Sequence, residues 1–398
     1  IVILGDYDVD GITATAILME FLQSCGCSHL DFFIPNRLQH GYGLTEASVN
    51  VLCSMRPEIL ITVDNGITAR KEVATLQSSG IPVLITDHHL ASPDSLPEAI
   101  TLNPNHPECD YPFKKISGCG VAFKLAMALR KALRELGWWR EQRPEPNLKE
   151  LLDFAAMGTV ADVVELRDEN RLMVSVGLEL MNEKPRPSVQ ALRQVKKVDE
   201  VTARTLGFQF APLMNAAGRL ADASLAVKML LSPTLEDALP LVRELNEINE
   251  QRRTQEQEMT QIALQQAQEQ AHRRGFVLAS PEFHEGINGI VAARIVERYY
   301  KPTLVLSTHH PERFSGSGRS IPEFHMKEAL QECADLLLRF GGHAGAAGCT
   351  VSPDMLDAFR ERFFAVCERR LPEIPRAQLM LDGELSLSLL SEELVGQI

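Results

Sequence analysis

The feature that most constrains the fold is an alternation of short apolar runs with longer amphipathic stretches. The runs predict strands at residues 1–4, 31–34, 59–63 and 82–86, and helical periodicity predicts helices at 13–23, 68–78 and 121–136. This rhythm is typical of βαβ units, so we expect an α/β fold with a parallel sheet covered by helices. Ligands of such sheets bind at the carboxyl ends of the strands, which makes the residues after each run the first candidates for a site.

The second half of the chain predicts a long connecting helix and another α/β region. Residues 235–274 are rich in Gln and Glu and predict a solvated helix that spaces two domains. Beyond them we expect strands at 276–279 and 303–307 and helices at 290–299 and 327–339. The stretch "LMLDGELSLSLLSEEL" alternates like a further strand. We therefore expect domains at 1–190, 191–274, 275–372 and 373–398. The chain opens within a strand and lacks an initiator Met, so we expect it to be truncated at both ends.

Composition narrows the class of protein. Of the 398 residues 45% are hydrophobic, but no apolar run is long enough to cross a membrane. The 8 cysteines lack paired spacing, which favours reduced packing residues in a cytoplasmic protein over a metal site at Cys25-Gly26-Cys27. A net charge of −13 argues against a protein that coats polyanions. It leaves room for a local cleft whose positive charge comes from a few arginines and bound cations.

Acidic residues and histidines follow several of the predicted strands. The sets are "DYDVDG" after the first strand, "DNG" after the third, "DHH" after the fourth, and an Asp that ends the apolar helical stretch "DFAAMGTVAD". A single Asp after a strand is usually a helix cap or a turn residue. Four such sets at one sheet edge would repel each other strongly unless cations were bound. Carboxylates with imidazoles favour Mn²⁺ or Mg²⁺, and two such ions would suit phosphoryl hydrolysis.

These motifs resemble a known superfamily. "DYDVDG", "VDNGI", "DHH" and "GTVADVV" are similar to the four motifs of the DHH phosphoesterases, and "HEGINGIVAARIVERYYKPTLVLS" and "RFGGHAGAAG" to the DHH-associated domain. "PNRLQHGYGL", "SGCGVAFKLA" and "APLMNAAGRL" resemble the exonuclease branch of that superfamily. The resemblance covers essentially the whole chain. It implies a parallel-sheet DHH domain, joined by a long helix to a smaller α/β DHH-associated domain, followed by the start of an OB-fold.

The resemblance also implies roles for individual residues. Asp64 is expected to bridge two ions, and His89 to contact the scissile phosphate. The implied metal ligands are Asp6, Asp8, Asp10, Asp64, His88 and Asp162. The implied catalytic residues are Asp8, Asp10, Asp64, His88, His89 and Asp162. The implied substrate contacts are Arg37, Arg219, Ser317, Arg319, Gly341, Gly342 and His343. Three alternatives stay open: Arg219 as a helix cap, His284 as a structural residue, and Phe208 and Phe210 as base-stacking rather than core residues, although we favour the core.

The implied activity is 5′→3′ hydrolysis of single-stranded DNA by a two-metal mechanism with Mn²⁺ or Mg²⁺, in DNA repair and recombination. A helicase and a single-strand-binding protein are implied partners, no membrane is involved, and we expect a monomer. A phosphodiesterase for short oligoribonucleotides or cyclic dinucleotides is the alternative, because it shares every metal ligand. An inactive replication scaffold on the same fold is disfavoured, because all the acids are present.

Overall fold

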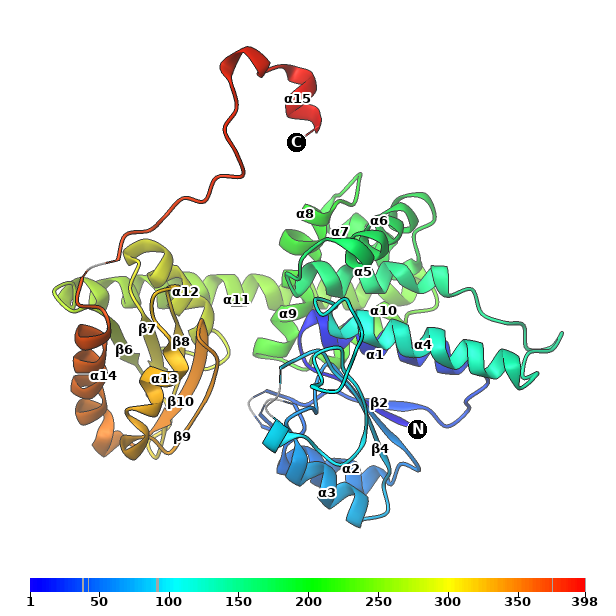
Figure 1. Ribbon diagram of the computed structural model, residues 1–398, viewed down its shortest axis with the longest axis horizontal. Helices are drawn as coiled ribbons and strands as arrows, with labels where there is room; N and C mark the ends of the chain where they lie inside the picture. The colour runs from blue at the N-terminus through cyan, green and yellow to red at the C-terminus, as the bar shows by residue number, and fades with distance from the viewer. Residues whose placement is uncertain (38, 42, 91–92, 374, 398) are drawn as a thin grey trace. The chain divides into compact units, whose positions relative to one another are not determined.

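The computed structural model describes residues 1–37, 39–41, 43–90, 93–373 and 375–397 (Figure 1). The chain forms two compact units, Ile1–Gln255 and Glu256–Ile398, and each is considered by itself. Within the described residues, no helix has the length and apolar character that a membrane crossing requires.

The first unit is built on the predicted parallel sheet. Its strand order is β2-β1-β3-β4-β5, and every neighbouring pair is parallel. The bounds are β1 Val2–Leu4, β2 Asp31–Phe33, β3 Leu60–Val63, β4 Val83–Thr86 and β5 Ile100–Leu102. The first four match the apolar runs in the sequence, whereas β5 follows no recognisable run. All the strands therefore end at one edge, where ligands of such sheets bind.

Helices cover both faces of this sheet (Figure 1). Successive residues of a strand point to opposite faces, so Ile3 of β1 joins one core while Val2 and Leu4 join the other. The Ile3 side packs against α1 (Val9–Ser24), α4 (Gly118–Glu135) and α5 (Leu152–Ala161). The opposite side packs against α2 (Glu46–Met55) and α3 (Arg70–Ser78).

A helical region follows α5. It contains α6 (Asp168–Glu183), α7 (Pro187–Lys196), α8 (Ala203–Thr205), the π-helical turn η3 (Leu206–Phe210), α9 (Ala211–Leu220) and α10 (Ser224–Leu230). The long helix was predicted, and α11 spans Leu235–Glu269, 35 residues. Its predicted solvated character is wrong in part, because Ala238, Val242 and Leu245 are buried in the first unit's core.

The second unit contains a mixed sheet of order β6-β7-β8-β10-β9. Its strands are β6 Phe276–Ser280, β7 Thr303–Ser307, β8 Phe314–Arg319, β9 Arg339–Gly342 and β10 Ala346–Val351; β6 and β7 are parallel and the other pairs antiparallel. The helices α13 (Met326–Gln331) and α14 (Leu356–Arg370) pack on one face, and α12 (Asn288–Tyr299) contacts β7 and β8.

The C-terminal part of α11 contributes polar groups to this sheet. Gln266 donates to the Ala279 carbonyl (3.0 Å) and accepts from its N–H (2.9 Å). Gln270 does the same for Val277, at 3.0 and 3.1 Å. Two side-chain amides one helical turn apart thus supply the hydrogen bonds that a neighbouring strand would give to β6. The Gln-rich composition of this stretch predicts a solvated helix and gives no sign of these hydrogen bonds.

Two predictions in the second half need correction. The helix expected at 327–339 ends at Gln331, and Arg339 already begins β9. The "GGHAGAAG" stretch forms a hairpin between β9 and β10. The strand expected in "LMLDGELSLSLLSEEL" does not form: among residues 375–397 the chain has a 3₁₀ turn at Leu387–Leu389 and α15 at Glu392–Gln397. A strand needs a paired neighbour, and none lies beside this segment among the described residues. The OB-fold start stays a prediction.

Candidate metal centre

The first acidic motif forms the turn between β1 and α1. Asp8 is the N-cap of α1, and its carboxylate accepts from the N–H groups of Asp10 (3.0 Å) and Gly11 (3.2 Å). Gly11 packs directly on Asp6, since a Cβ at this position would lie 2.5 Å from the Asp6 nitrogen. The close turn places Asp6, Asp8 and Asp10 at the carboxyl end of β1.

Asp10 is held by the N-terminus of another helix. Its carboxylate accepts hydrogen bonds from the N–H groups of Gly118 (2.6 Å) and Cys119 (2.8 Å), in the first turn of α4. The positive end of the helix dipole and its free N–H groups stabilise a buried carboxylate. A Cβ at Gly118 would lie 2.5 Å from Oδ1 of Asp64, so glycine is required for α4 to approach.

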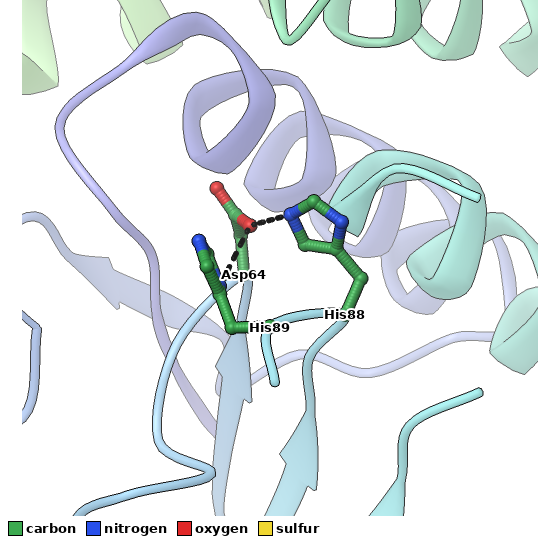
Figure 2. Close-up of side chains that lie close together, drawn as sticks. All are labelled: Asp64, His88 and His89. Atoms are coloured by element: carbon green, nitrogen blue, oxygen red, sulfur yellow. Dashed lines mark ion pairs between the residues drawn. The ribbon is translucent and has the colours of Figure 1, made fainter. Parts of the chain in front are cut away.

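Asp64 follows β3 with a left-handed backbone (φ 61°) and is buried. His88 approaches it after β4, with Nε2 3.1 Å from Asp64 Oδ1 (Figure 2). The same nitrogen lies 3.8 Å from an oxygen of Asp10 and 3.7 Å from one of Asp162, the C-cap of α5. The structure therefore brings together the predicted ligands from four separate elements.

His89 lies on the other side of Asp64 (Figure 2), with its Nδ1 3.9 Å from the Asp64 carboxylate. The nearer partner of that nitrogen is Asp87, at 2.8 Å. Asp87 also accepts from the backbone N–H groups of His88 (2.7 Å), His89 (3.1 Å) and Ile67 (3.0 Å), which fixes its position. Although burial opposes protonation, the hydrogen bond and charge of Asp87 raise the pKa of His89 to about 9.

The electrostatics of the acidic cluster favour a bound cation. Burial and then the charge of a neighbouring carboxylate raise the pKa values of Asp6 and Asp64 well above the usual range and also raise that of Asp8. Burial, Asp10 and Asp8 raise the pKa of Asp162 to about 8. Such shifts arise when carboxylates are crowded without a compensating positive charge.

Buried atoms that lack a hydrogen-bond partner indicate whether the acidic cluster can bind cations. Asp64 Oδ1 and His88 Nε2 lie 3.1 Å apart, yet neither has a hydrogen-bond partner in the described part of the chain, and neither has Asp6 Oδ1. Three overlapping sets offer ligand atoms within 4.8 Å of one another: Asp6–Asp8–Asp64, Asp64–His88–His89 and Asp10–His88–Asp162. Asp64 and His88 each belong to two sets. The donor set therefore fits more than one hard divalent cation.

Two predicted substrate contacts in the first unit lie close to the acidic cluster. The Arg37 guanidinium is 5.4 Å from the centre of the Tyr7 ring. Arg219 is in the last turn of α9, as a helix cap would be. Burial raises the pKa of Tyr7, whereas the charges of Arg37 and Arg219 oppose that rise, so both arginines are near Tyr7. The two arginines therefore place positive charge beside the residue between Asp6 and Asp8.

The other predicted contacts gather on three strands of the second unit. Ser317 of β8 pairs with Gly348 of β10, which pairs with Gly341 of β9, so the three form one row across the sheet. A Cβ at Gly341 would meet no atom within 4 Å, and Gly342 has φ 134°. The remaining predicted contacts, Arg319 and His343, lie at the end of β8 and in the β9–β10 turn.

The structure also bears on the alternatives left open for the two phenylalanines and for His284. Phe210 is buried in the core, but Phe208 is exposed, so the core prediction for Phe208 is wrong. The residues lie two apart in one helical segment and therefore face opposite ways. His284 forms a turn ahead of α12: its Nδ1 accepts from the N–H of Gly286 (3.1 Å), and its carbonyl accepts from the N–H of Ile287 (2.9 Å).

Sequence reasoning missed residues that support the histidines. Asp87 was part of the motif but was given no role. Asn103 donates to the His89 carbonyl (3.0 Å) and Asn105 to the His88 carbonyl (2.6 Å). Both come from "LNPNH", directly after β5. Polar residues after a strand could have been recognised by the same rule that found the acids, had β5 been predicted.

The parallel sheet with acids and a histidine at its carboxyl edge defines a phosphoesterase of the metal-dependent DHH class. Residues 1–159 match the family model described as the DHH family, N-terminal domain, and residues 273–369 match the DHHA1 domain.

Comparison with individual proteins identifies the branch. The chain is 40% identical to the single-stranded-DNA-specific exonuclease RecJ of Escherichia coli K12 over 401 residues, which is 97% of this chain and 69% of the relative. A crystal structure of exonuclease RecJ bound to manganese superposes with a TM-score of 0.80 at 35% identity, covering 94% of this chain and 92% of that one. RecJ of Thermus thermophilus in complex with Mn²⁺ gives 0.78 at 34% identity, covering 92% and 52%. The chain belongs to the RecJ family of DHH phosphoesterases.

Proposed function

We propose that the protein is a single-stranded-DNA-specific exonuclease that hydrolyses phosphodiester bonds in the 5′→3′ direction with two Mn²⁺ or Mg²⁺ ions. The observation that carries the proposal is that two buried atoms, Asp64 Oδ1 and His88 Nε2, lack a hydrogen-bond partner among the described residues, while Asp64 and His88 each belong to two of three overlapping ligand sets. Membership of the RecJ family supports the substrate class, since the relatives it matches act on single-stranded DNA. The proposed role is in DNA repair and recombination.

The ligands would be Asp6, Asp8, Asp10, Asp64, His88 and Asp162, with Asp64 common to both ions. Two divalent cations supply Lewis acidity, which lowers the pKa of water and offsets charge on the phosphate oxygens. Although burial opposes it, the hydrogen bond and charge of Asp87 raise the pKa of His89 to about 9, which favours the imidazolium at neutral pH. The His89 imidazolium can therefore hold a phosphate oxygen or give a proton to the leaving oxygen.

Substrate binding would use positive and small residues. In the first unit, Arg37 would hold the terminal 5′ phosphate and Arg219 a further phosphate. In the second unit, Ser317 and Arg319 would contact phosphates of the strand. The row of Ser317, Gly348 and Gly341 supports close approach of a sugar–phosphate backbone, because no side chain stands over Gly341. Gly342 and His343 would complete the contact. Recognition of the terminal 5′ phosphate would give the cleavage its direction.

The cellular setting is part of the proposal. We infer a monomeric cytoplasmic enzyme that works with a helicase and a single-strand-binding protein. The eight free cysteines are compatible with a reducing compartment.

A substrate panel tests the function. The protein with Mn²⁺ would receive a single-stranded DNA oligomer labelled at its 3′ end, a matching duplex and a labelled dinucleotide. We expect stepwise shortening of the single strand from its 5′ end, with the duplex spared. Rapid cleavage of the dinucleotide with an intact long strand would instead favour the phosphodiesterase alternative. No Mn²⁺-dependent cleavage of any substrate would favour the scaffold.

A further inference from the structure

Two large apolar side chains are exposed at the end of α5 that carries Asp162. Val163 follows this acid directly and is 86% exposed. Phe208, in the turn η3, is 78% exposed. The turn lies against the same end of α5, since a Cβ at Gly207 would be 3.7 Å from Cγ1 of Val160. Val163 and the turn η3 therefore lie at the same end of α5 as Asp162.

The backbone of Val163 is not the one that folding favours for valine. Its φ is 59°, and a β-branched residue in this left-handed region is a genuine outlier. The position after a helix C-terminus favours Gly or Asn, which adopt this conformation with less strain. Strained residues of this kind concentrate at functional sites. The valine side chain gains no burial from the fold that would offset its strain.

Phe208 is presented by an irregular turn. The Ala211 N–H bonds to the Leu206 carbonyl across five residues, so the segment is π-helical, and such turns are frequent at functional sites. Leu206 and Phe210 on either side of Phe208 are buried and anchor the turn in the core. The ring between them is left facing solvent on a rigid base.

We infer that Val163 and Phe208 form an apolar rim that receives the nucleotides beside the cleaved bond. The inference rests on the proposed function. With a phosphate at the metal centre, the apolar parts of the strand within reach are sugars and base faces. Val163, next to Asp162, packs on the sugar and base of the nucleotide at the centre. Phe208 stacks on a neighbouring base, a contact that accepts every base because each has a π face.

The test pairs protein variants with modified substrates. Val163→Gly and Phe208→Ala would be measured on a single-stranded 12-mer and on versions with one abasic site at each of the first five positions. We expect each variant to lower kcat/KM on the intact strand by about 10-fold. One abasic strand lacks the base that the substituted residue contacts. On that strand the variant and the wild type should have the same kcat/KM, because the contact is already absent. Phe208→Trp, which keeps an aromatic face for stacking, should lose less kcat/KM than Phe208→Ala.

Matched controls separate contact from structure. Lys197→Gly replaces another left-handed residue (φ 55°), after α7, and Leu136→Ala removes a side chain that is 78% exposed after α4. Both should retain wild-type kcat/KM. Val163→Gly should keep the wild-type Mn²⁺ affinity and should not lower the Tm, since glycine relieves the strained backbone. Weakened Mn²⁺ affinity would show that Val163 acts by placing Asp162, and would overturn the inference for it.

The remaining outcomes distinguish two failures. If the wild type does not shorten the intact strand, the proposed function fails, and this inference fails with it. If the wild type is active but both variants match it, or lose equally on every abasic strand, the rim does not contact the nucleotides and only the inference is overturned.

Discussion

At the scale of single residues, Asp64 combines a buried carboxylate with a left-handed backbone and lies between the two histidines of the motif (Figure 2). Asparagine is the substitution that keeps its shape and tolerates the same φ. The change therefore removes the charge while leaving the local backbone intact.

We expect Asp64→Asn to lower Mn²⁺-dependent hydrolysis by roughly 10³-fold or more, because the ligand common to both ions is lost. Without metal, the variant should be more stable than the wild type at pH 8 by about 1–2 kcal/mol, since one member of a repelling group is neutral. Chemical denaturation in EDTA measures this gain. The exposed Asp357→Asn is the control and should change neither quantity. Retained activity in Asp64→Asn would break the two-metal argument.

Asp87 acts through His89 rather than through a cation. In Asp87→Asn, the pKa of His89 should fall from about 9 toward its ordinary value, because the carboxylate that stabilises the imidazolium is gone. An NMR titration of the metal-free protein measures this shift. Hydrolysis should fall by about 10–100-fold, as is usual when a group that orients a functional histidine is removed. An unchanged His89 pKa would exclude this role for Asp87.

At the scale of elements, the centre depends on the close approach of α4 to β3. In Gly118→Ala, the new methyl group would lie 2.5–2.7 Å from three atoms of Asp64, so the helix must retreat and weaken its hydrogen bonds to Asp10. We expect a loss of about 1–3 kcal/mol of unfolding free energy, together with weaker Mn²⁺ binding. Gly207→Ala is the control for stability, because its methyl group would meet only Val160 at 3.7 Å. Equal stability of the two variants would contradict the packing argument.

The elements that sequence reasoning found are those with a strong apolar signal. The strands β1, β3 and β4 are buried on both faces and read as apolar runs, so the acids after them could be assigned to one edge. The strands β8, β9 and β10 contain "SGSGR", "RFGG" and "AAGCT", where glycine removes the alternating pattern and pairing alone makes the strand. The contact between Asp10 and α4 joins residues 108 apart, and no local pattern encodes it.

At the scale of the whole molecule, the two units have separate hydrophobic cores, and among the described residues the acidic cluster belongs to the first unit. Scanning calorimetry should therefore show two transitions, of which Mn²⁺ raises one. At a metal concentration 100 times the Kd, the gain of about 2.7 kcal/mol corresponds to a shift of roughly 5–10 °C. Gly118→Ala identifies the transition of the first unit. A single transition that moves as a whole with Mn²⁺ would contradict independent units.

The unfolding transition of the first unit should depend on pH when metal is absent. Asp162 titrates at about 8 in the folded chain and near 4 when unfolded, so the folded state binds more protons between these values. Stability is therefore expected to fall as the pH rises from about 5 to 8, and the gain from Mn²⁺ should be larger at pH 8. Chelated samples scanned across this range measure the slope. A stability that rises with pH would contradict the raised pKa.

The amides of Gln266 and Gln270 have a consequence for how the protein behaves in concentrated solution. An unpaired edge strand invites another chain to extend the sheet, which leads to aggregation. On β6, the two amides occupy the N–H and carbonyl groups of Val277 and Ala279, so this edge is closed to a second molecule. Gln266→Ala combined with Gln270→Ala should therefore scatter more light at high protein concentration. Gln257→Ala with Gln261→Ala, one turn apart on the same helix, is the matched control and should stay dispersed.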